Sequence, residues 1–371
     1  MTPIETTPVF DENQALWTED HQAAGCPQCG RVYIVRSDQL EQICPLCRKA
    51  ALEPQPVRMR AAEPERILPF RIDKKGLNTI YANAVSRVWI KPDDFTPESL
   101  LRNTIPLFWP LWLVDSDVQG HWQMEAGFDY QVESSQEFYN SGQWQSRKQI
   151  EGRVRWEPRL GRVQTHVDNV SAPGLEEHQN RVQMTGNYPM EQSRPYSPGM
   201  ESQALLEVPD FPPEDAWPLA QPAVDRAIGD ICLKAAGAQH FRNFSIKGEY
   251  TNLNWTQFLL PLYATHYTDD EGEKQILIVN GVTGTLKGPL LASTKRGSRI
   301  AGIVGGVAGG LIGLALIGLL LTMVIPVASI IAGILGFLGL LTGIGALIPL
   351  VQPGQWNHGQ TGPRIAKGPK V

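Results

Sequence analysis

The sequence predicts an α+β fold in three parts, on three observations. Two CxxC pairs lie near the N-terminus, short alternating runs fill the middle of the chain, and no charged residue occurs between Arg299 and Arg364. They indicate a small N-terminal zinc ribbon, a mixed and mostly antiparallel α+β domain, and a C-terminal transmembrane hairpin of two helices. The expected parts are an acidic tail (1–21), the ribbon (22–50), a linker (51–66), the α+β domain (67–292), and the hairpin with a basic tail (293–371).

The first pair is Cys26 and Cys29, and the second is Cys44 and Cys47, with fourteen residues between the pairs. Each CxxC turn presents two thiolates to one metal, and four sulfurs suit Zn²⁺ in a closed, structural site. A ribbon this small cannot bury enough apolar surface to fold unaided, so the metal should supply most of its folding free energy. A rubredoxin-like iron site, disulfides and redox-active thiols are the alternatives. Cys232 is expected to be a small buried residue.

Alternating segments such as Gly152–Trp156 and Ile276–Val279 are broken by Gly, Asn and Pro, which is typical of short antiparallel strands. Two helices are expected, Asn78–Val88 and Pro213–Ala236. The second opens on acidic residues and closes at Gly237.

Two stretches of the middle region resemble each other. Pro110-Leu111-Trp112 is followed by Asp117 and Gly120, and Pro261-Leu262-Tyr263 by Asp270 and Gly272. Both are interpreted as hairpins entered by a proline, and they predict two possible related hairpin modules. Chance similarity between aromatic hairpins is the alternative.

The apolar run from Ile300 to Val351 would extend about 75 Å as one helix, against a hydrocarbon core of roughly 30 Å. Pro326 lies near its middle, so two helices over about 300–324 and 327–351 are expected. A buried core hairpin and a re-entrant hairpin are the alternatives. Four-residue spacing of Gly305, Gly309 and Gly313 predicts close packing, between the two spans or between copies in a homo-oligomer.

Loop charges predict the orientation of the hairpin. Lys295, Arg296 and Arg299 precede the first span, Arg364 and Lys367 follow the second, and the turn between the spans is uncharged. The acidic N-terminus does not have the pattern of a signal peptide. We therefore expect a multi-pass protein of the cytoplasmic membrane with both termini and the α+β domain in the cytosol.

The sequence also bears on two other kinds of function, nucleic-acid binding and catalysis. The net charge of −5 argues against a protein that coats nucleic acid. The densest basic stretch, interleaved with Trp144 and Trp156, is interpreted as the solvated side of a sheet rather than a nucleic-acid face. Its members are Arg147, Lys148, Arg153, Arg155, Arg159 and Arg162. The sequence has no phosphate-binding loop, nucleophile elbow or HExxH motif, so no catalytic or cofactor-binding residue is predicted.

Several motifs resemble those of a family of bacterial membrane proteins with an N-terminal zinc ribbon, sometimes labelled helicase-like or primosomal. The motifs are the two CPxC knuckles, Leu68-Pro69-Phe70 with Ala84 and Trp89, Pro110–Asp115, Leu259–Tyr263 and Val279–Gly288. The last looks like a VNGxTGxVxG hairpin, itself similar to the terminal turn of PepSY-type domains. The acidic turn Asp269–Lys274 departs from the Gly-Lys hairpin common in that family.

The resemblance implies an architecture and no activity, since a helicase would need a phosphate-cradling loop. The expected function is that of a membrane-tethered zinc-ribbon protein that binds or scaffolds a protein partner and is not an enzyme. A nucleic-acid-binding protein held at the membrane and a membrane-anchored hydrolase are the alternatives.

Overall fold

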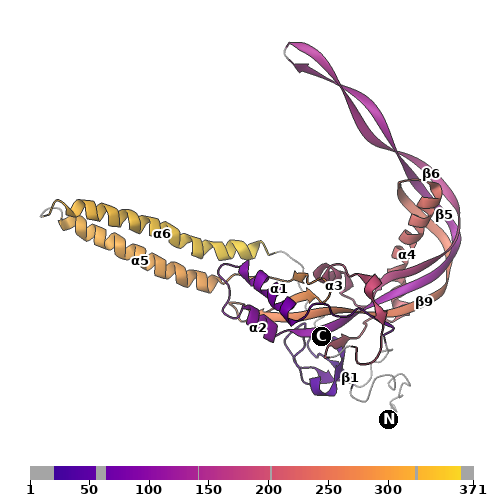
Figure 1. Ribbon diagram of the computed structural model, residues 1–371, viewed down its shortest axis with the longest axis horizontal. Coiled ribbons are helices and arrows are strands. Elements are labelled where there is room, and N and C mark those ends of the chain that lie inside the picture. The colour runs from indigo at the N-terminus through magenta and orange to yellow at the C-terminus, as the bar shows by residue number, and fades with distance from the viewer. Residues whose placement is uncertain (1–20, 56–63, 141, 201–202, 322–324, 361–371) are drawn as a thin grey trace, which may run out of the picture.

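One mixed sheet runs through the protein, and two long projections leave it (Figure 1). The computed structural model describes residues 21–55, 64–140, 142–200, 203–321 and 325–360. The predicted acidic tail up to residue 20 and the basic tail lie outside these residues. One projection is an arm of β-strands and the other is a pair of helices.

The strand order along the main path of the sheet is β11-β10-β9-β5-β8-β2-β1-β3, and most neighbours are antiparallel. The strands are β1 (His21–Gly25), β2 (Val32–Arg36), β3 (Glu53–Pro54), β4 (Arg66–Ile67), β5 (Ile105–Asn140), β6 (Gln143–Pro173), β7 (Arg194–Pro195), β8 (Leu205–Glu207), β9 (His240–Thr268), β10 (Lys274–Asn280) and β11 (Leu286–Lys287). The helices are α1 (Lys74–Ser86), α2 (Pro97–Arg102), α3 (His178–Thr185), α4 (Pro213–Ala236), α5 (Thr294–Leu321) and α6 (Ala328–His358). The content is therefore mixed α and β, as predicted.

The N-terminal ribbon is continuous with the main sheet. Strand β2 pairs with β8, with Tyr33 opposite Glu207, and β8 in turn runs parallel to β5. Both ends of the expected linker also lie in the sheet, because β3 pairs with β1 and β4 pairs with β9. Its middle, 56–63, lies outside the described residues. The ribbon is thus a sheet edge rather than a separate module on a tether.

The central strands are much longer than the short runs that the sequence predicts. Strands β5, β6 and β9 contain 36, 31 and 29 residues. Glycines that look like breaks instead let strands approach closely: a Cβ on Gly120 would lie 2.6 Å from the Cα of Gly248 on the neighbouring strand. Register shifts at Val114/Ser116 and at Gln123/Glu125 accommodate the curvature of the long strands.

The predicted turn at Asp117 and Gly120 is wrong, because both residues lie inside β5. Its counterpart is correct: Gly272, with φ of 85°, lies in the turn between β9 and β10. Pro110 and Pro261 occupy adjacent antiparallel strands, and each strand follows a helix. A relationship between the two hairpins stays a prediction.

Helix α4 has the predicted bounds, and Gly237 closes it in the left-handed region at φ of 66°. It packs inside the curve of β5, β6 and β9, where Cys232 is buried as predicted (Figure 1). Helix α1 begins earlier than the expected Asn78, because Asp73 caps it by accepting a hydrogen bond of 2.8 Å from the Gly76 amide.

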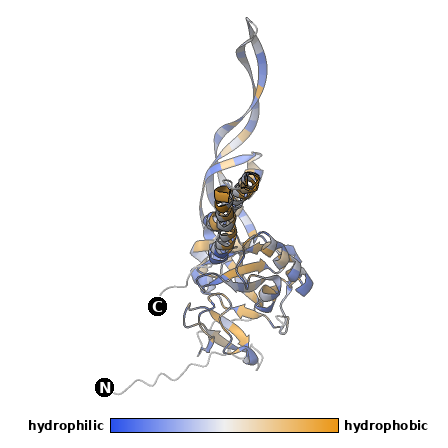
Figure 2. Ribbon diagram, turned by 90° about the vertical axis from the view of Figure 1, so that its left-hand side faces the viewer, coloured by the Kyte–Doolittle hydropathy of each residue, from blue (hydrophilic) through white to orange (hydrophobic). Residues whose placement is uncertain are grey.

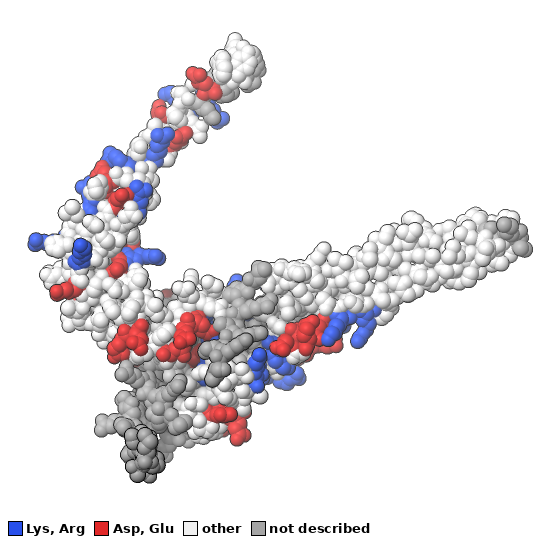
Figure 3. Space-filling view, turned by 180° about the vertical axis from the view of Figure 1, so that it is seen from behind, with Lys and Arg blue, Asp and Glu red and all other residues white. Residues whose placement is uncertain are grey.

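Helices α5 and α6 form the second projection, which is apolar along its length and free of charged side chains beyond its base (Figures 2 and 3). Both helices are long and apolar enough to cross a membrane. Helix α5 begins before the predicted residue 300, and α6 continues past Val351, because both ends dock on the body of the protein.

The two helices contact each other through small residues at seven-residue intervals. These are Ala301, Ala308 and Ala315 on α5, and Ala332, Gly339 and Ala346 on α6. A Cβ on Gly339 would lie 2.7 Å from the Ile312 side chain, so the backbones are close there. By contrast, a Cβ on Gly305, Gly309 or Gly313 would meet no atom within 4 Å. The glycine run of α5 therefore does not pack on α6, which leaves packing between copies of the chain as the alternative that stays a prediction.

Candidate metal centre

The two CxxC pairs fold into matching turns that point at one another. Cys26 follows β1, and the Gly30 amide donates a 2.9 Å hydrogen bond to the Cys26 carbonyl. In the second turn the Arg48 amide donates to the Cys44 carbonyl at 3.1 Å. Gly30 and Arg48 hold equivalent positions with φ of 72° and 56°. Each turn therefore aims two sulfurs into the space between the pairs.

The sulfur geometry fits one tetrahedral metal. The Sγ atoms of Cys26 and Cys47 lie 3.5 Å apart, those of Cys29 and Cys44 lie 3.8 Å apart, and all four lie within 4.8 Å of one another. Zinc–sulfur bonds of about 2.3 Å at tetrahedral angles require sulfur separations of about 3.8 Å. A disulfide would require about 2.05 Å, and all four cysteines are free. The predicted residues are thus positioned to hold a metal ion with no disulfide.

The four thiols shift one another's pKa values in opposite directions. Burial raises the pKa of Cys26 to about 11. The hydrogen bond with Cys29, together with burial, raises the pKa of Cys47 to about 11, whereas hydrogen bonds from Cys44 and Cys47 lower that of Cys29. A divalent metal at this place would lower the pKa of all four thiols, because its charge stabilises the thiolate forms.

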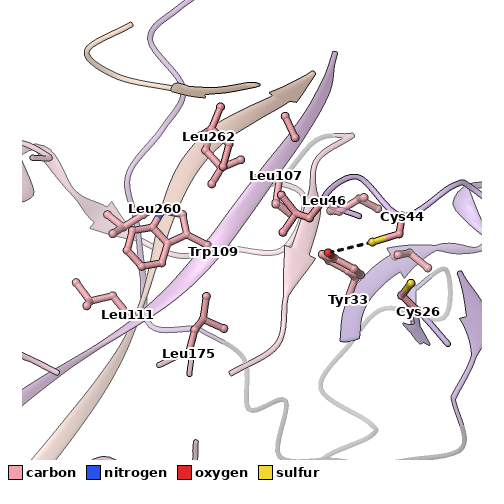
Figure 4. Close-up of a cluster of buried hydrophobic side chains, with 14 of the residues drawn as sticks. Cys26, Tyr33, Cys44, Leu46, Leu107, Trp109, Leu111, Leu175, Leu260 and Leu262 are labelled. Atoms are coloured by element: carbon pink, nitrogen blue, oxygen red, sulfur yellow. Dashed lines mark hydrogen bonds between the residues drawn. The ribbon is translucent and has the colours of Figure 1, made fainter. Parts of the chain in front are cut away.

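The ribbon shares one hydrophobic core with the sheet. Tyr33 is fully buried, and its hydroxyl lies 3.6 Å from the Cys44 sulfur (Figure 4). Leu46 of the second turn belongs to the same cluster as Leu107 and Trp109 of β5. A change in the four-cysteine site would therefore disturb the sheet as well as the ribbon.

A buried network of four charges lies where the ribbon meets the sheet. Arg181 of α3 donates two hydrogen bonds to Glu207 of β8, at 3.0 and 3.2 Å, and a third to Glu177 at 2.5 Å. Arg31 of the ribbon approaches the same Glu177 oxygen to 2.7 Å. Arg181 and Glu207 are only 1% and 2% exposed. Two cations and two anions thus neutralise one another between β2, β8 and α3.

Burial and ion pairing act in opposite directions on the charges of this network: burial raises the pKa of the Glu207 carboxyl above its ordinary value, although Arg181 and Arg31 act to lower it. Although burial acts to lower the pKa of Arg181, the carboxylates of Glu207 and Glu177 raise it, so the guanidinium stays charged. Sequence reasoning missed these residues. The one available signal was Glu207 itself, a charged residue within the apolar run Ala204–Val208, because carboxylates are rarely buried unless paired.

The motifs Leu68–Phe70, Leu259–Tyr263 and Val279–Gly288 meet at one corner of the sheet. The Asn280 carboxamide oxygen accepts hydrogen bonds from the amides of Val282 and Thr283, at 2.9 and 3.0 Å. A Cβ on Gly281 would lie 2.7 Å from the Phe70 ring, so glycine is needed there for close approach. These contacts agree with the interpretation of this motif as a tight turn.

The acidic turn between β9 and β10 anchors the helical hairpin. Asp270 accepts hydrogen bonds from the Ser293 hydroxyl at 2.7 Å and the Lys295 amide at 2.9 Å, at the start of α5. At the end of α6, the Asn357 side chain forms hydrogen bonds of 2.7 and 3.0 Å with the backbone of Ala292, and the Trp356 indole donates to the Leu290 carbonyl at 2.6 Å. Both helix ends are therefore fixed to one short segment. Burial acts to raise the Asp270 pKa, but hydrogen bonds led by that from Lys295 lower it overall.

The basic stretch lies on β6, where three of its arginines are paired with acids of the same strand. Arg153 forms an ion pair of 3.1 Å with Glu151, while Arg155 and Arg159 contact Glu157 at 2.9 and 2.6 Å. All three arginines are exposed to solvent. This is the geometry expected for the solvated side of a sheet.

Comparison of the chain with family models, curated proteins and solved structures found no match in any of the three. The four-cysteine site and the helical hairpin are the two features of the described residues that bear on function. The resemblance drawn from the sequence motifs stays a prediction.

Proposed function

We propose that this chain is a non-enzymatic, membrane-tethered binding or scaffolding protein. A zinc ribbon and an α+β body are held at the inner face of the cytoplasmic membrane by α5 and α6. The observation that carries the proposal is the rigid attachment of an almost uncharged helical hairpin to a body that contains a closed four-cysteine site.

Exposure of the hairpin supports its immersion in lipid. The helices bury little besides the small residues that face each other, and large apolar side chains point outward, with Leu320 76% exposed. Exposed apolar surface costs about 25 cal/mol per Å² in water, and a soluble protein rarely exposes a large contiguous apolar patch. A buried core hairpin would have its outer faces covered, so this alternative has no support among the described residues.

Charge at the base of the hairpin supports a cytosolic body. Lys295, Arg296 and Arg299 lie in the first turns of α5, and Arg296 forms an ion pair of 3.2 Å with Asp93. Positive residues that flank a span favour the cytoplasmic side. Arg364 and Lys367 lie outside the described residues.

The chemistry of the cysteine site supports structural zinc. Four thiolates leave a tetrahedral ion with no open coordination position, so substrate could not reach the metal. Iron binds the same donor set in rubredoxin-like sites, and metal analysis distinguishes the two ions.

The open glycine face of α5 is where a second copy would pack if the protein self-associates.

The ion pairs of β6 give no argument for nucleic-acid binding, because Arg153, Arg155 and Arg159 each already lie near a carboxylate. The hydrolase alternative stays an untested prediction. One open hollow of about 570 Å³ lies between the ribbon and the start of β5, lined by residues that include Arg36, Glu41 and Thr104. The hydroxyl of Thr104, which lines this hollow, donates its hydrogen bond to the Leu100 carbonyl at 2.7 Å.

Crosslinking in living cells followed by mass spectrometry tests the proposal. The full chain should recover the same protein partner repeatedly, and Cys26→Ser should weaken that recovery because the ribbon loses its metal. Cys232→Ser, which changes a buried cysteine outside the ribbon, is the matched control. Failure to recover any partner, together with turnover of a substrate by the purified chain, would refute the proposal.

A further inference from the structure

The distal part of the β arm carries an exposed aromatic pair. Pairing between β5 and β9 ends at Gly127 and His240, so beyond this point β5 and β6 continue as a two-stranded ribbon. At its end Tyr139 lies opposite Trp144, with ring centroids 5.4 Å apart. The two side chains are 62% and 72% exposed.

A third apolar side chain lies on the same face of the ribbon. Residues directly opposite in an antiparallel pair point to the same side, and so does every second residue along each strand. Trp144 and Ile150 therefore share the face of Tyr139, and Ile150 is 63% exposed. A two-stranded ribbon is marginally stable in water by itself, so an exposed pair of aromatic rings at its end calls for an apolar neighbour.

The course of the arm indicates which neighbour this is. The arm leaves the body beside α4 and then bends back toward the side on which α5 and α6 project (Figures 1 and 3). Its end therefore approaches the level at which the helical hairpin leaves the body. If that hairpin crosses a bilayer, as in the function proposed above, the end of the arm faces the surface of the same bilayer.

We propose that Tyr139 and Trp144, at the end of the arm, insert into the interfacial layer of the bilayer that holds α5 and α6. Trp and Tyr are enriched at this depth because their rings are apolar while the indole N–H and phenol O–H keep hydrogen bonds to water and headgroups. The body is then attached at two separated points, the hairpin and the arm. Nucleic acid is a poorer occupant, because Lys148 and Arg153 lie within 3.4 and 3.1 Å of Glu133 and Glu151.

Nitroxide labels on the full chain test this inference. The chain is reconstituted in vesicles of phosphatidylethanolamine and phosphatidylglycerol, with Cys232→Ala as the background and Ser146→Cys as the labelled site. Ser146 lies on the same face as Trp144 and is exposed. Gly152→Cys is the matched control, since it lies on the same face farther from the tip and an added Cβ there meets no atom within 4 Å. The Cys232→Ala chain without an added cysteine shows whether the nitroxide reagent reacts with the four cysteines of the metal site.

Collisions with oxygen report contact with lipid, and collisions with a water-soluble nickel chelate report contact with water. Compared with the label at residue 152, the label at residue 146 should collide more often with oxygen and less often with the nickel chelate. This difference should persist at high salt. Tyr139→Ser combined with Trp144→Ser should return the label at 146 to water. Unchanged mobility of the label at 152 in this double variant shows that the arm stays folded.

A third label, Ile317→Cys on α5, separates this inference from the proposed function on which it rests. If that label is shielded from nickel while the label at 146 is open to it, the tip inference is wrong and the membrane hairpin stands. If the label at 317 is itself open to nickel, both are wrong. Dipolar broadening between labels at 146 would show a second copy at the tip and would also overturn the inference.

Discussion

Replacing Arg181 with leucine should destabilise the junction between the ribbon and the sheet by about 3–5 kcal/mol, the usual cost of removing one partner from a buried ion pair. In the native protein Glu207 accepts hydrogen bonds of 3.0 and 3.2 Å from Arg181. Without Arg181, its nearest cation is Arg31, at 3.6 Å from a single oxygen. The network would then hold two anions and one cation.

The second replacement tests the charge argument. Removing Glu207 together with Arg181 leaves Arg31 and Glu177, which form an ion pair of 2.7 Å, so the buried network is neutral again. Arg181→Leu combined with Glu207→Leu should therefore recover much of the stability lost in either single variant. Arg153→Leu removes an exposed ion pair on β6 and should cost less than about 1 kcal/mol.

Hydrogen exchange of the full chain measures these differences at the junction. The amides to follow are those of Leu205–Glu207 and Val32–Arg36, the two strands that the network joins. A loss of 3–5 kcal/mol should accelerate their exchange roughly a hundredfold to several thousandfold. Exchange that is unchanged in Arg181→Leu, or a double variant less stable than both single variants, would refute the reasoning.

Three further predictions concern the metal, the anchor and the helical hairpin. Cys44→Ser should lower the zinc content measured by elemental analysis and speed hydrogen exchange throughout β1 and β2, whereas Cys232→Ser should leave the zinc content unchanged. In the native chain zinc should be released as pH falls, because the thiolate ligands take up protons. Asp270→Ala should loosen the first turn of α5 by about 1 kcal/mol in hydrogen exchange. The pKa of Asp270 is lowered in the folded chain, so its stabilisation of the first turn of α5 is complete above the ordinary carboxyl pKa and is lost as pH falls through the folded pKa. The native chain should therefore exchange faster at α5 in acid, and the Asp270→Ala variant should not show this pH dependence. Gly339→Leu should separate α5 from α6 and lower the melting temperature in detergent, while Gly345→Leu, which meets no atom within 4 Å, should not.

Features encoded by local spacing were predictable from the sequence. The CxxC pairs specify their own turns, and the positions of Pro213 and Gly237 specify both ends of α4. The uncharged run likewise predicted two apolar helices, although not the docking of their ends through Asp270 and Asn357.

Features that depend on distant partners were not predictable. Gly120 looks like a break until it is seen opposite Gly248 on another strand, and the ribbon joins the sheet through Glu207, far away in the sequence. The glycine run of α5 shows the same limit, because its spacing predicts close packing without specifying the partner helix. Local patterns therefore predicted the helices and the four cysteines that lie together, while the long strands and the buried charges required the pairing of remote segments.

Fractionation of cells that express the full chain tests membrane insertion of α5 and α6 most directly. Membranes are collected by ultracentrifugation and washed with alkaline carbonate, which removes peripheral proteins. The full chain should stay in the membrane pellet, and a chain lacking residues 294–358 should be released by the wash. Recovery of the intact full chain as a monodisperse species in the detergent-free supernatant would contradict the account.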